Sequence, residues 1–339
     1  MALRWIEGFE GFGGLSGAPL IAEVAKKYDA SSVSGVTLED GRGSGNSLNI
    51  GTTNAQFISK TFDDQTTWVI GFAFHTPSAF TGVGRVMVNI LEDAAPQMVL
   101  KLTNDDLEVF RNASLLQTIT LSLSTSTWYY IEFKVTIHDS AGAWEVRVNG
   151  STVDSDSGID TSDNGNPVGN TVKIHSIVDF PWYDDIYILD GTGSVNNNFL
   201  GEMKVEILLP NSDSISSDWL LSAGSDHYAL VDDNPSDEDT TYVYSSTSDD
   251  VDYYNYEDIG SELQTIYGVQ INTQARVLAA SMDMYLTVSS NSSVSNGTAV
   301  TVSDTNYKTF ARPIELDPDT SALWLSGGID DALFGVKFV

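Results

Sequence analysis

The chain has 339 residues, of which 41% are hydrophobic and 10% aromatic, enough for about two folded domains. Its 16 Lys and Arg are outnumbered by 47 Asp and Glu, and the formal net charge of −31 argues against a nucleic-acid partner or an anionic membrane surface. The absence of Cys excludes disulfides, zinc sites built on thiolates, iron–sulfur clusters and thiol catalysis.

The first residues do not resemble a secretory signal, because Glu7 and Glu10 interrupt the apolar run that such a segment needs. A short helix is predicted over 19–28, where Pro19 suits the first turn and two lysines stand near the end. No stretch approaches roughly 18 consecutive apolar residues, so we expect no membrane insertion.

Up to residue 210, apolar and polar residues alternate with a period of two, which predicts strands that bury one face. Positions 68, 70, 72 and 74 form one such face, and the hairpin of 131–137 and 144–148 is the clearest pair. Further strands are predicted at 97–102, 107–111, 115–121, 172–177, 184–189 and 203–209. Many short strands separated by turns such as Asn149-Gly150 are typical of a sandwich or barrel.

Residues 211–260 differ in composition, since they hold thirteen Asp and Glu, no Lys or Arg, six Tyr and one Trp. A disordered segment would lack these aromatic residues, so we predict an ordered, extended acidic connector. One turn of helix is expected at 259–263. Strands then resume at 266–271, 276–280, 284–289, 297–302, 308–314 and 332–338, which predicts a small β-sandwich domain over 261–339.

The predicted hairpin resembles one of concanavalin-type, laminin-G-like jelly-roll domains. Its two segments are Trp128-Tyr-Tyr-Ile-Glu-Phe-Lys-Val-Thr-Ile137 and Trp144-Glu-Val-Arg-Val-Asn-Gly150. The resemblance implies an all-β protein with a concanavalin-like jelly-roll sandwich over 1–210, followed by the acidic connector and the smaller C-terminal domain. Many unrelated binding modules share this fold, so it implies no single function.

A series of segments in order along the chain is similar to tailed-bacteriophage structural proteins. These segments are Leu3-Arg-Trp-Ile-Glu-Gly-Phe-Glu10, Tyr183-Asp-Asp-Ile-Tyr-Ile-Leu-Asp-Gly191, Asn198-Phe-Leu-Gly201, 205–210, Asp218-Trp219, Ile266-Tyr-Gly-Val-Gln-Ile271, 316–324 and Gly335-Val-Lys337. The resemblance implies a virion component on the head surface or the tail. Such proteins usually have no assigned catalytic residues, so none is carried over.

The acidic loops contain candidate calcium ligands, namely Asp154, Asp156, Asp160 and Asp163. The helix–loop–helix calcium motif needs Glu at its twelfth position, which is Gly165 counted from Asp154 and Thr171 counted from Asp160. An irregular site at a loop rim, of the kind some laminin-G-like domains have, is the alternative to a solvated loop. Residues 232–239 have the same two interpretations. We therefore expect no cofactor, with calcium as the alternative.

Catalytic patterns are weak. A glycoside hydrolase would need carboxylates on one strand face, and the nearest match, Glu315 with Asp317, is followed by Pro318 in a predicted turn. No hydrolase or metalloprotease motif includes a histidine, the candidates being His75, His138, His175 and His227. The glycine-rich stretch 41–45 lacks the lysine of a phosphate loop and is interpreted as a flexible turn. We therefore predict that the chain is not an enzyme.

The aromatic residues fall into two groups. Trp68, Trp128 and Trp144 lie on apolar strand faces and are assigned to the core. For the less clearly placed residues, among them Trp182, the favoured role is an interface, with core packing and sugar stacking as alternatives. The best candidates for contact with a neighbouring subunit are Tyr242, Tyr244, Tyr253, Tyr254 and Tyr256.

The favoured hypothesis is a non-enzymatic structural component of a phage virion: a capsid-surface decoration or cement protein, or a head fibre. The alternatives are a tail-fibre or tail-adaptor protein and a carbohydrate-binding host-recognition module. The expected partners are major capsid or tail proteins, with a host glycan for the last alternative, and the expected state is a homotrimer by analogy. The expected location is the virion, after synthesis in the host cytoplasm. A partner of 211–260 should be basic.

Overall fold

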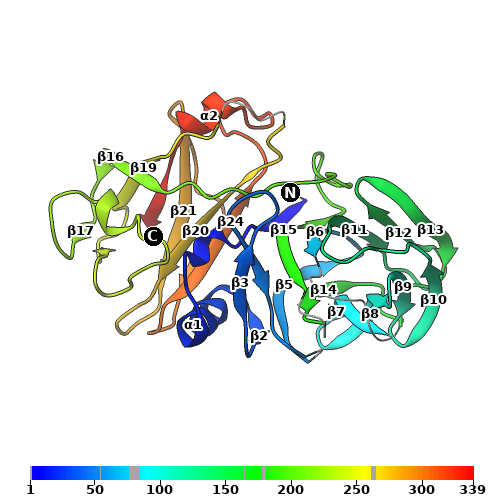
Figure 1. The fold of residues 1–339 in the computed structure, drawn as a ribbon. Coiled ribbons are helices and arrows are strands. Elements are labelled where there is room, and N and C mark those ends of the chain that lie inside the picture. Colours follow the sequence, from blue (N-terminus) through cyan, green and yellow to red (C-terminus); the bar gives the residue numbers. More distant parts are fainter. Residues whose placement is uncertain (1, 54, 76–83, 164, 178–180, 261–264) are drawn as a thin grey trace. The chain divides into compact units, whose positions relative to one another are not determined.

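The computed structural model describes residues 2–53, 55–75, 84–163, 165–177, 181–260 and 265–339 (Figure 1). The chain divides into two compact units, Met1–Val205 and Glu206–Val339, here called unit 1 and unit 2. Nearly all of their regular secondary structure is β-strand, which confirms the predicted all-β class. Within the described residues, no helix is both long and apolar enough to span a membrane.

Unit 1 contains two antiparallel sheets. The first has the order β13 (Ser151–Ile159), β12 (Gly142–Val148), β11 (Trp128–Thr136), β6 (Thr67–His75), β15 (Trp182–Asp190), β4 (Asn46–Asn49), β3 (Thr37–Asp40), and β1 (Leu3–Glu7) also pairs with β15. The second has the order β10 (Ser114–Ile119), β9 (Asp106–Arg111), β8 (Ala95–Thr103), β7 (Arg85–Glu92), β14 (Gly169–His175), β5 (Phe57–Gln65), β2 (Ala30–Ser32). A short 3-10 helix, η1 (Glu10–Phe12), follows β1, and α1 (Gly17–Lys27) confirms the predicted helix.

The central strand β6 is buried on both faces. Trp68, on the predicted apolar face, donates from Nε1 to the carbonyl of Gly169 in the second sheet at 3.1 Å, so this face forms the interior of the sandwich. On the opposite face, Val69 and Ala73 pack with Leu3, Tyr130, Tyr187 and Leu189, under cover of Phe199, Leu200 and Met203. The first sheet therefore has a covered outer face as well as a core face.

The predicted hairpin is present. β11 pairs with β12 from Ile131 opposite Val148 to Thr136 opposite Ala143. Asn149 and Gly150 then turn the chain into β13 with φ of 50° and 74°, the left-handed pair that a tight hairpin turn requires.

The strand predicted at 203–209 is wrong. In the described structure these residues form no strand, although their sequence alternates. The amide of Val205 donates to the carboxylate of Asp185 at 2.8 Å, and the guanidinium of Arg42 donates to the carbonyl of Met203. Because side chains bind these backbone groups, a ladder with a neighbouring strand is not formed here.

Unit 2 is built around one antiparallel sheet whose strands differ in length. Its order is β16 (Pro210–Ser217), β19 (Val251–Tyr256), β25 (Leu333–Phe338), β21 (Met282–Ser290), β22 (Ser293–Ser295), with β23 (Val300–Val302) also paired to β21. Two ribbons accompany it, β17 (Leu220–Leu221) with β18 (Val243–Tyr244), and β20 (Val269–Ala275) with β24 (Lys308–Ile314). The short helices are η2 (Tyr228–Leu230) and α2 (Ser326–Asp330), and the core includes Leu286, Val288, Trp324, Ile329 and Val336.

Residues 211–260 were predicted to form a connector between two domains. In the structure they are part of unit 2. β19 pairs with the last strand of the chain, from Val251 opposite Lys337 to Tyr254 opposite Phe334. β16 pairs with β19 on its other side. The physical reason is that Tyr253 and Tyr254 supply buried apolar surface, which the high acidic content concealed.

Two smaller predictions also differ. Residues 276–280 lie outside the strands, and Leu278 among them is 84% exposed. The helical turn predicted at 259–263 is not formed at Ile259 and Gly260, and its remaining residues lie outside the described residues.

Candidate functional site

Three aromatic residues stand side by side on neighbouring strands of the outer face of the first sheet of unit 1, and their rings contact one another. His75 on β6 is opposite Trp128 on β11 and opposite Trp182 on β15, because these strands are neighbours in register. The imidazole stacks on the Trp182 ring with 4.3 Å between centroids and 19° between planes. Trp128 approaches the imidazole at 5.1 Å and the Trp182 ring at 6.3 Å. We call His75, Trp128 and Trp182 the aromatic row.

The aromatic row is partly open to solvent. Both tryptophans are partly exposed, whereas His75 between them is 7% exposed. Burial lowers the pKa of His75, so its ring is neutral at neutral pH. Among the described residues, nothing hydrogen-bonds its buried Nδ1. The row therefore presents apolar ring surface with an uncharged centre.

A charged group borders the aromatic row on the same face. Two residues further along the strands, Tyr130 and Asp184 stand opposite Ala73. The guanidinium of Arg42 lies 5.0 Å from the Tyr130 ring centroid, within cation–π range. Arg42 also donates from its amide to Asp184 at 2.7 Å and pairs through Nε with Asp185 at 2.9 Å. The aromatic row thus borders a guanidinium that two carboxylates hold in place.

The local backbone is shaped for this group. The register of β15 shifts between Asp184 and Tyr187, and Asp185 has a positive φ of 50°, which brings both carboxylates under the glycine-rich stretch 41–45. A Cβ at Gly41 would lie 2.5 Å from the carbonyl oxygen of Ser44. The stretch predicted as a flexible turn is therefore a turn packed against acidic side chains, and it carries Arg42.

Three carboxyl groups here bind protons unusually tightly. Burial, with the nearby carboxylates of Asp184, Glu7 and Asp185, raises the pKa of Glu10 to about 8. Burial and the neighbouring Asp185 raise the pKa of Asp184 to about 7, and burial raises that of Asp185. At neutral pH, Glu10 is therefore mostly protonated, which reduces the charge repulsion in the cluster.

The last residues of unit 1, 199–205, cover this face and are here called the strap. The amide of Gly201 donates to Glu132 at 2.9 Å, and the amide of Leu200 donates to the Tyr187 hydroxyl at 3.2 Å. Phe199 lies under the guanidinium of Arg147, 4.0 Å from it. The strap is thus fixed by carboxylates and cations of the sheet below it, beside the aromatic row.

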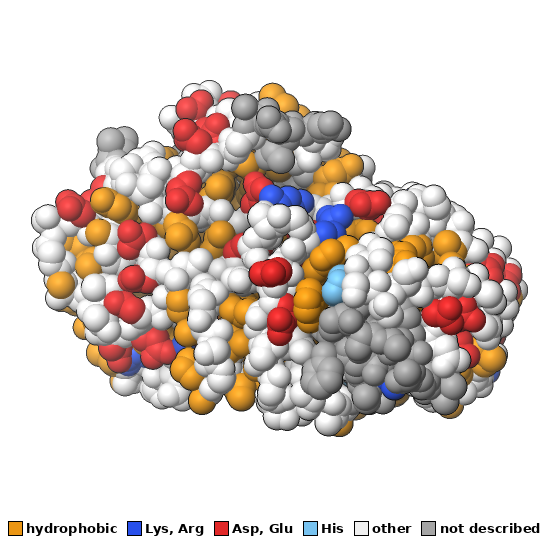
Figure 2. Space-filling model, in the orientation of Figure 1, with side chains coloured by type: hydrophobic (Ala, Val, Ile, Leu, Met, Phe, Trp, Pro, Cys, Tyr) orange, Lys and Arg blue, Asp and Glu red, His pale blue; other side chains and the backbone are white. Residues whose placement is uncertain are grey.

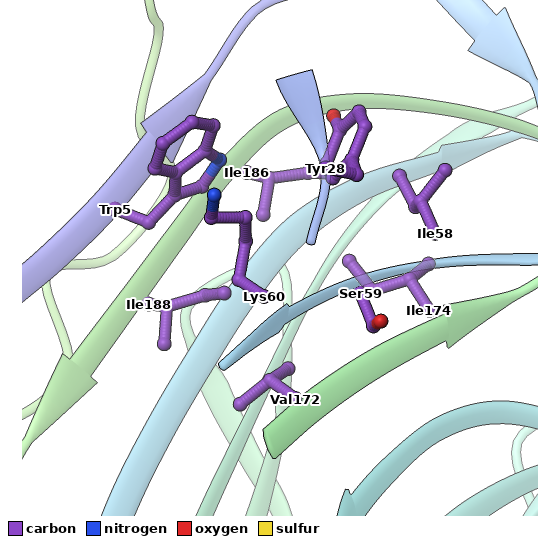
Figure 3. Close-up of a pocket in the computed structure, with 9 residues that line it drawn as sticks. All are labelled: Trp5, Tyr28, Ile58, Ser59, Lys60, Val172, Ile174, Ile186 and Ile188. Atoms are coloured by element: carbon purple, nitrogen blue, oxygen red, sulfur yellow. The ribbon is translucent and has the colours of Figure 1, made fainter. Parts of the chain in front are cut away.

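The cavity shown in Figure 3 is not large enough for a ligand. It lies between β1 and β15 of one sheet and β5 and β14 of the other, and its lining residues are Trp5, Tyr28, Ile58, Ser59, Lys60, Val172, Ile174, Ile186 and Ile188. At the side of the cavity, Lys60 Nζ lies 4.3 Å from the centroid of the Trp5 ring. The free space of the cavity, about 10 Å³, is close to that of one water molecule, so the cavity is a packing defect of the core.

The predicted calcium ligands do not converge. Asp154 accepts from Gln117 at 2.6 Å, Asp160 pairs with Arg111, and Asp163 accepts from Asn112 at 2.8 Å. Asp156 accepts from the amide of Ser157. Over the described residues, three or more acidic or histidine side chains nowhere gather as metal ligands would.

The predicted interface tyrosines separate into two groups. Tyr242 and Tyr244 are exposed, at 36% and 46%, and their rings contact each other. Tyr253 and Tyr254 are buried, and Tyr256 packs edge-on against Phe334 in unit 2. These last three lie on β19, which is paired on both sides, and their contact with a neighbouring subunit stays a prediction. Trp128, predicted in the core, is partly buried against the outer-face cluster of unit 1 and also belongs to the aromatic row.

The remaining candidates have structural partners. Asp317 accepts from the amide of Asp319 at 3.0 Å and from the Thr320 hydroxyl at 3.1 Å, which stabilises the predicted turn. His138 accepts the amides of Ser140 and Ala141 through Nδ1 in another turn.

A histidine–carboxylate pair in unit 2 was missed by the sequence reasoning. His227 Nδ1 lies 2.7 Å from the fully buried Asp252, which also accepts from Tyr254 and from the amide of Trp219. The two residues are 25 positions apart, and no motif connects them.

The aromatic row could have been found from the period of β6. His75 has the parity of Val69 and Ala73, opposite to the core face of Trp68, so it had to point to the outer face. Which residues lie next to His75 depends on which strands flank β6. That pairing order was not predicted.

No protein-family model matches the chain, and a search of curated proteins found no match. Solved structures with a similar fold include the binding domain of Paraclostridial Mosquitocidal Protein 1, at 16% identity over 48% of this chain and 44% of that chain, with a TM-score of 0.35. The alginate lyase Aly36B matches at 11% identity over 55% of this chain and 97% of that one, with a TM-score of 0.38. The Botulinum Neurotoxin Type G Receptor Binding Domain matches at 13% identity over 68% of each chain, with a TM-score of 0.34. Similarity at this level carries no argument about this chain.

Proposed function

We propose that this chain is a non-enzymatic binding protein whose unit 1 holds a saccharide on the aromatic row. The observation that carries the proposal is the row itself, with two partly exposed tryptophan rings that pack against each other and against a neutral histidine on a rigid sheet. The apolar faces of sugar rings stack on aromatic rings of this kind. Because β6, β11 and β15 are paired strands, the rings are positioned before the ligand arrives, which lowers the entropic cost of binding.

Polar groups beside the row suit the hydroxyl groups of a sugar. The Arg42 side chain is 21% exposed and the Glu202 side chain 48% exposed, and the two are paired at 3.3 Å. They offer donors and acceptors at the edge of the ring surface. The carboxylates around Arg42 would repel an anionic sugar, so the proposed ligand is a neutral saccharide.

The resemblance to phage structural proteins supports a place for this module on a virion. In this proposal, the chain is a virion structural component, as a capsid-surface decoration, cement or head-fibre protein or as a tail-fibre or tail-adaptor protein. Many copies on one particle would turn weak individual contacts into strong adhesion. The same proposal includes a homotrimeric state and the absence of a catalytic step. It also includes ligand binding that does not depend on calcium.

A glycan array with the full chain tests saccharide binding. Wild type should bind a group of neutral glycans equally in calcium and in chelator, and Trp182→Ala should lose that group. Trp182→Phe, which keeps a ring in place, should restore part of the signal. Absence of binding at high protein concentration would overturn the saccharide proposal.

The virion role has a separate test. Mass spectrometry of purified particles should detect the chain, and electron microscopy should place it on the head surface or the tail. Its absence from particles, together with a strictly monomeric state in solution, would contradict this role and leave the saccharide test unaffected.

A further inference from the structure

The β17–β18 ribbon of unit 2 presents an exposed apolar face. Leu220 and Tyr244 are cross-strand partners, 57% and 46% exposed, and the Tyr242 ring lies 6.0 Å from that of Tyr244. Their strand neighbours Leu221 and Val243 are partly buried. We call Leu220, Tyr242 and Tyr244 the ribbon face. Its three side chains are exposed next to one another and form a patch, whereas exposed apolar residues usually occur singly.

The ribbon face is fixed to the sheet of unit 2. The amide of Tyr242 donates to the Ser222 hydroxyl at 2.9 Å, and the amide of Ser222 donates to the Tyr242 carbonyl at 3.0 Å. At its base, Trp219 donates from its amide to Asp252 and from Nε1 to the carbonyl of Asp250. The face is therefore preformed, and a partner would not have to order it.

Unit 2, which carries the ribbon face, is strongly acidic. Residues 206–339 contain 22 Asp and Glu and 4 Lys and Arg, a net charge of −18. Two of these cations are already paired, Arg276 with Asp239 at 2.7 Å and Lys337 with Asp249 at 2.8 Å, and Arg312 donates to carbonyls of β21 and β22. Figure 2 shows Asp and Glu side chains among hydrophobic ones over the part of the surface that belongs to unit 2.

We infer that the ribbon face is a docking surface for a protein that presents apolar side chains ringed by Lys and Arg. The charge complementarity selects this partner, because a second copy of unit 2, a nucleic acid or an anionic lipid surface would add like charge around the face. Apolar contact with Leu220 and the two tyrosines supplies the affinity, and the charges supply orientation and rate. The inference concerns unit 2 and does not depend on saccharide binding by unit 1.

Two labelled peptides of equal length and charge test the docking surface. One alternates Lys with Leu and the other alternates Lys with Ser, and their binding to the full chain is followed by fluorescence anisotropy at low and physiological salt. The Lys–Leu peptide should bind wild type about tenfold more tightly than the Lys–Ser peptide. In the triple variant Leu220→Ser, Tyr242→Ser, Tyr244→Ser the two peptides should bind equally, and salt should weaken all binding.

Leu115→Ser is the matched control, because Leu115 is 52% exposed on β10 of unit 1. It should keep the difference between the peptides. Hydrogen exchange should show protection by the Lys–Leu peptide at 218–222 and 242–245. If the triple variant melts early, Tyr244→Ser alone should still reduce the difference.

Three results would overturn the inference. Equal binding of both peptides to wild type would mean that charge alone acts. Protection elsewhere on the chain would place the contact on another surface. Self-association of wild type in sedimentation, lost in the triple variant, would assign the face to a second copy of the chain.

Discussion

Arg42 and Asp185 form an ion pair of 2.9 Å that joins three separate segments of unit 1. Arg42 comes from the glycine-rich stretch 41–45, and Asp185 comes from the irregular part of β15. The other oxygen of the same carboxylate accepts the amide of Val205 in the strap, and Arg42 itself donates to the carbonyl of Met203. One partly buried ion pair thus fixes the border of the aromatic row and the end of unit 1.

Replacing the guanidinium should release the strap. Arg42→Ala leaves the buried Asp185 carboxylate without its cation, which we expect to lower the free energy of unfolding of unit 1 by about 2 kcal/mol. Amide hydrogen exchange in 199–205 should accelerate. Arg42→Lys keeps the charge but not the forked donors, so its effect should be intermediate. Unchanged exchange of the strap in Arg42→Ala would contradict this account of the ion pair.

The raised carboxyl pKa values predict that unit 1 loses stability as the pH rises. Glu10 has a pKa of about 8 in the folded chain against an ordinary 4.5, and Asp184 about 7 against 3.8. The folded state therefore holds protons that the unfolded state releases, and stability falls as the pH rises from near 4.5 to about 8. Glu10→Gln stays neutral, so by calorimetry it should melt higher than wild type near pH 9, with a smaller difference near pH 5.

The matched control for this pH dependence is Asp139→Asn, since Asp139 is an exposed turn residue of the same unit. It should follow the wild-type melting curve at every pH. A constant difference between Glu10→Gln and wild type across the range would show that the proton on Glu10 is not involved.

The pairing of β19 with β25 makes a sharp prediction for unit 2. A Cβ at Gly335 would lie 1.8 Å from the backbone oxygen of Asp252 on the neighbouring strand. Gly335→Ala should therefore destabilise unit 2 by about 3 kcal/mol by overpacking. Gly327→Ala, where an added Cβ meets nothing within 4 Å, is the control. Equal melting temperatures of the two variants would contradict the described register.

Much of the fold follows from local patterns in the sequence. The alternation in 68–74 and 131–137 predicted strands correctly, because each strand keeps one continuous face in the sandwich interior. Asn149-Gly150 predicted a hairpin turn, since both residues tolerate the left-handed backbone conformation. Pro19 and the lysines predicted α1 for equally local reasons.

The errors come from contacts between distant residues. The segment 203–209 alternates like a strand, yet Asp185 and Arg42 take up its backbone groups. The acidity of 211–260 suggested a connector, while Tyr253 and Tyr254 pack inside a sheet completed by the last residues of the chain. Sequence periodicity does not report which strands pair, so neither outcome was predictable from it.

The candidate site was only partly predictable for the same reason. His75, Trp128 and Trp182 are separated by 53 and 54 positions and meet only because β11, β6 and β15 are neighbours. The residues were visible in the sequence, but their arrangement in one row was not. The raised pKa of Glu10 likewise depends on burial beside Asp184 and Asp185, which no local motif encodes.

The most direct test of the central claim is the affinity of the full chain for the best neutral glycan of the array, measured by titration with tryptophan fluorescence or calorimetry. Trp128→Ala and Trp182→Ala should each weaken binding at least about tenfold, because each removes one ring face from the aromatic row. Tyr244→Ser, an exposed aromatic residue of unit 2, should bind like wild type. Unchanged affinity in both tryptophan variants, with their folding intact, would contradict the assignment of the aromatic row as the saccharide site.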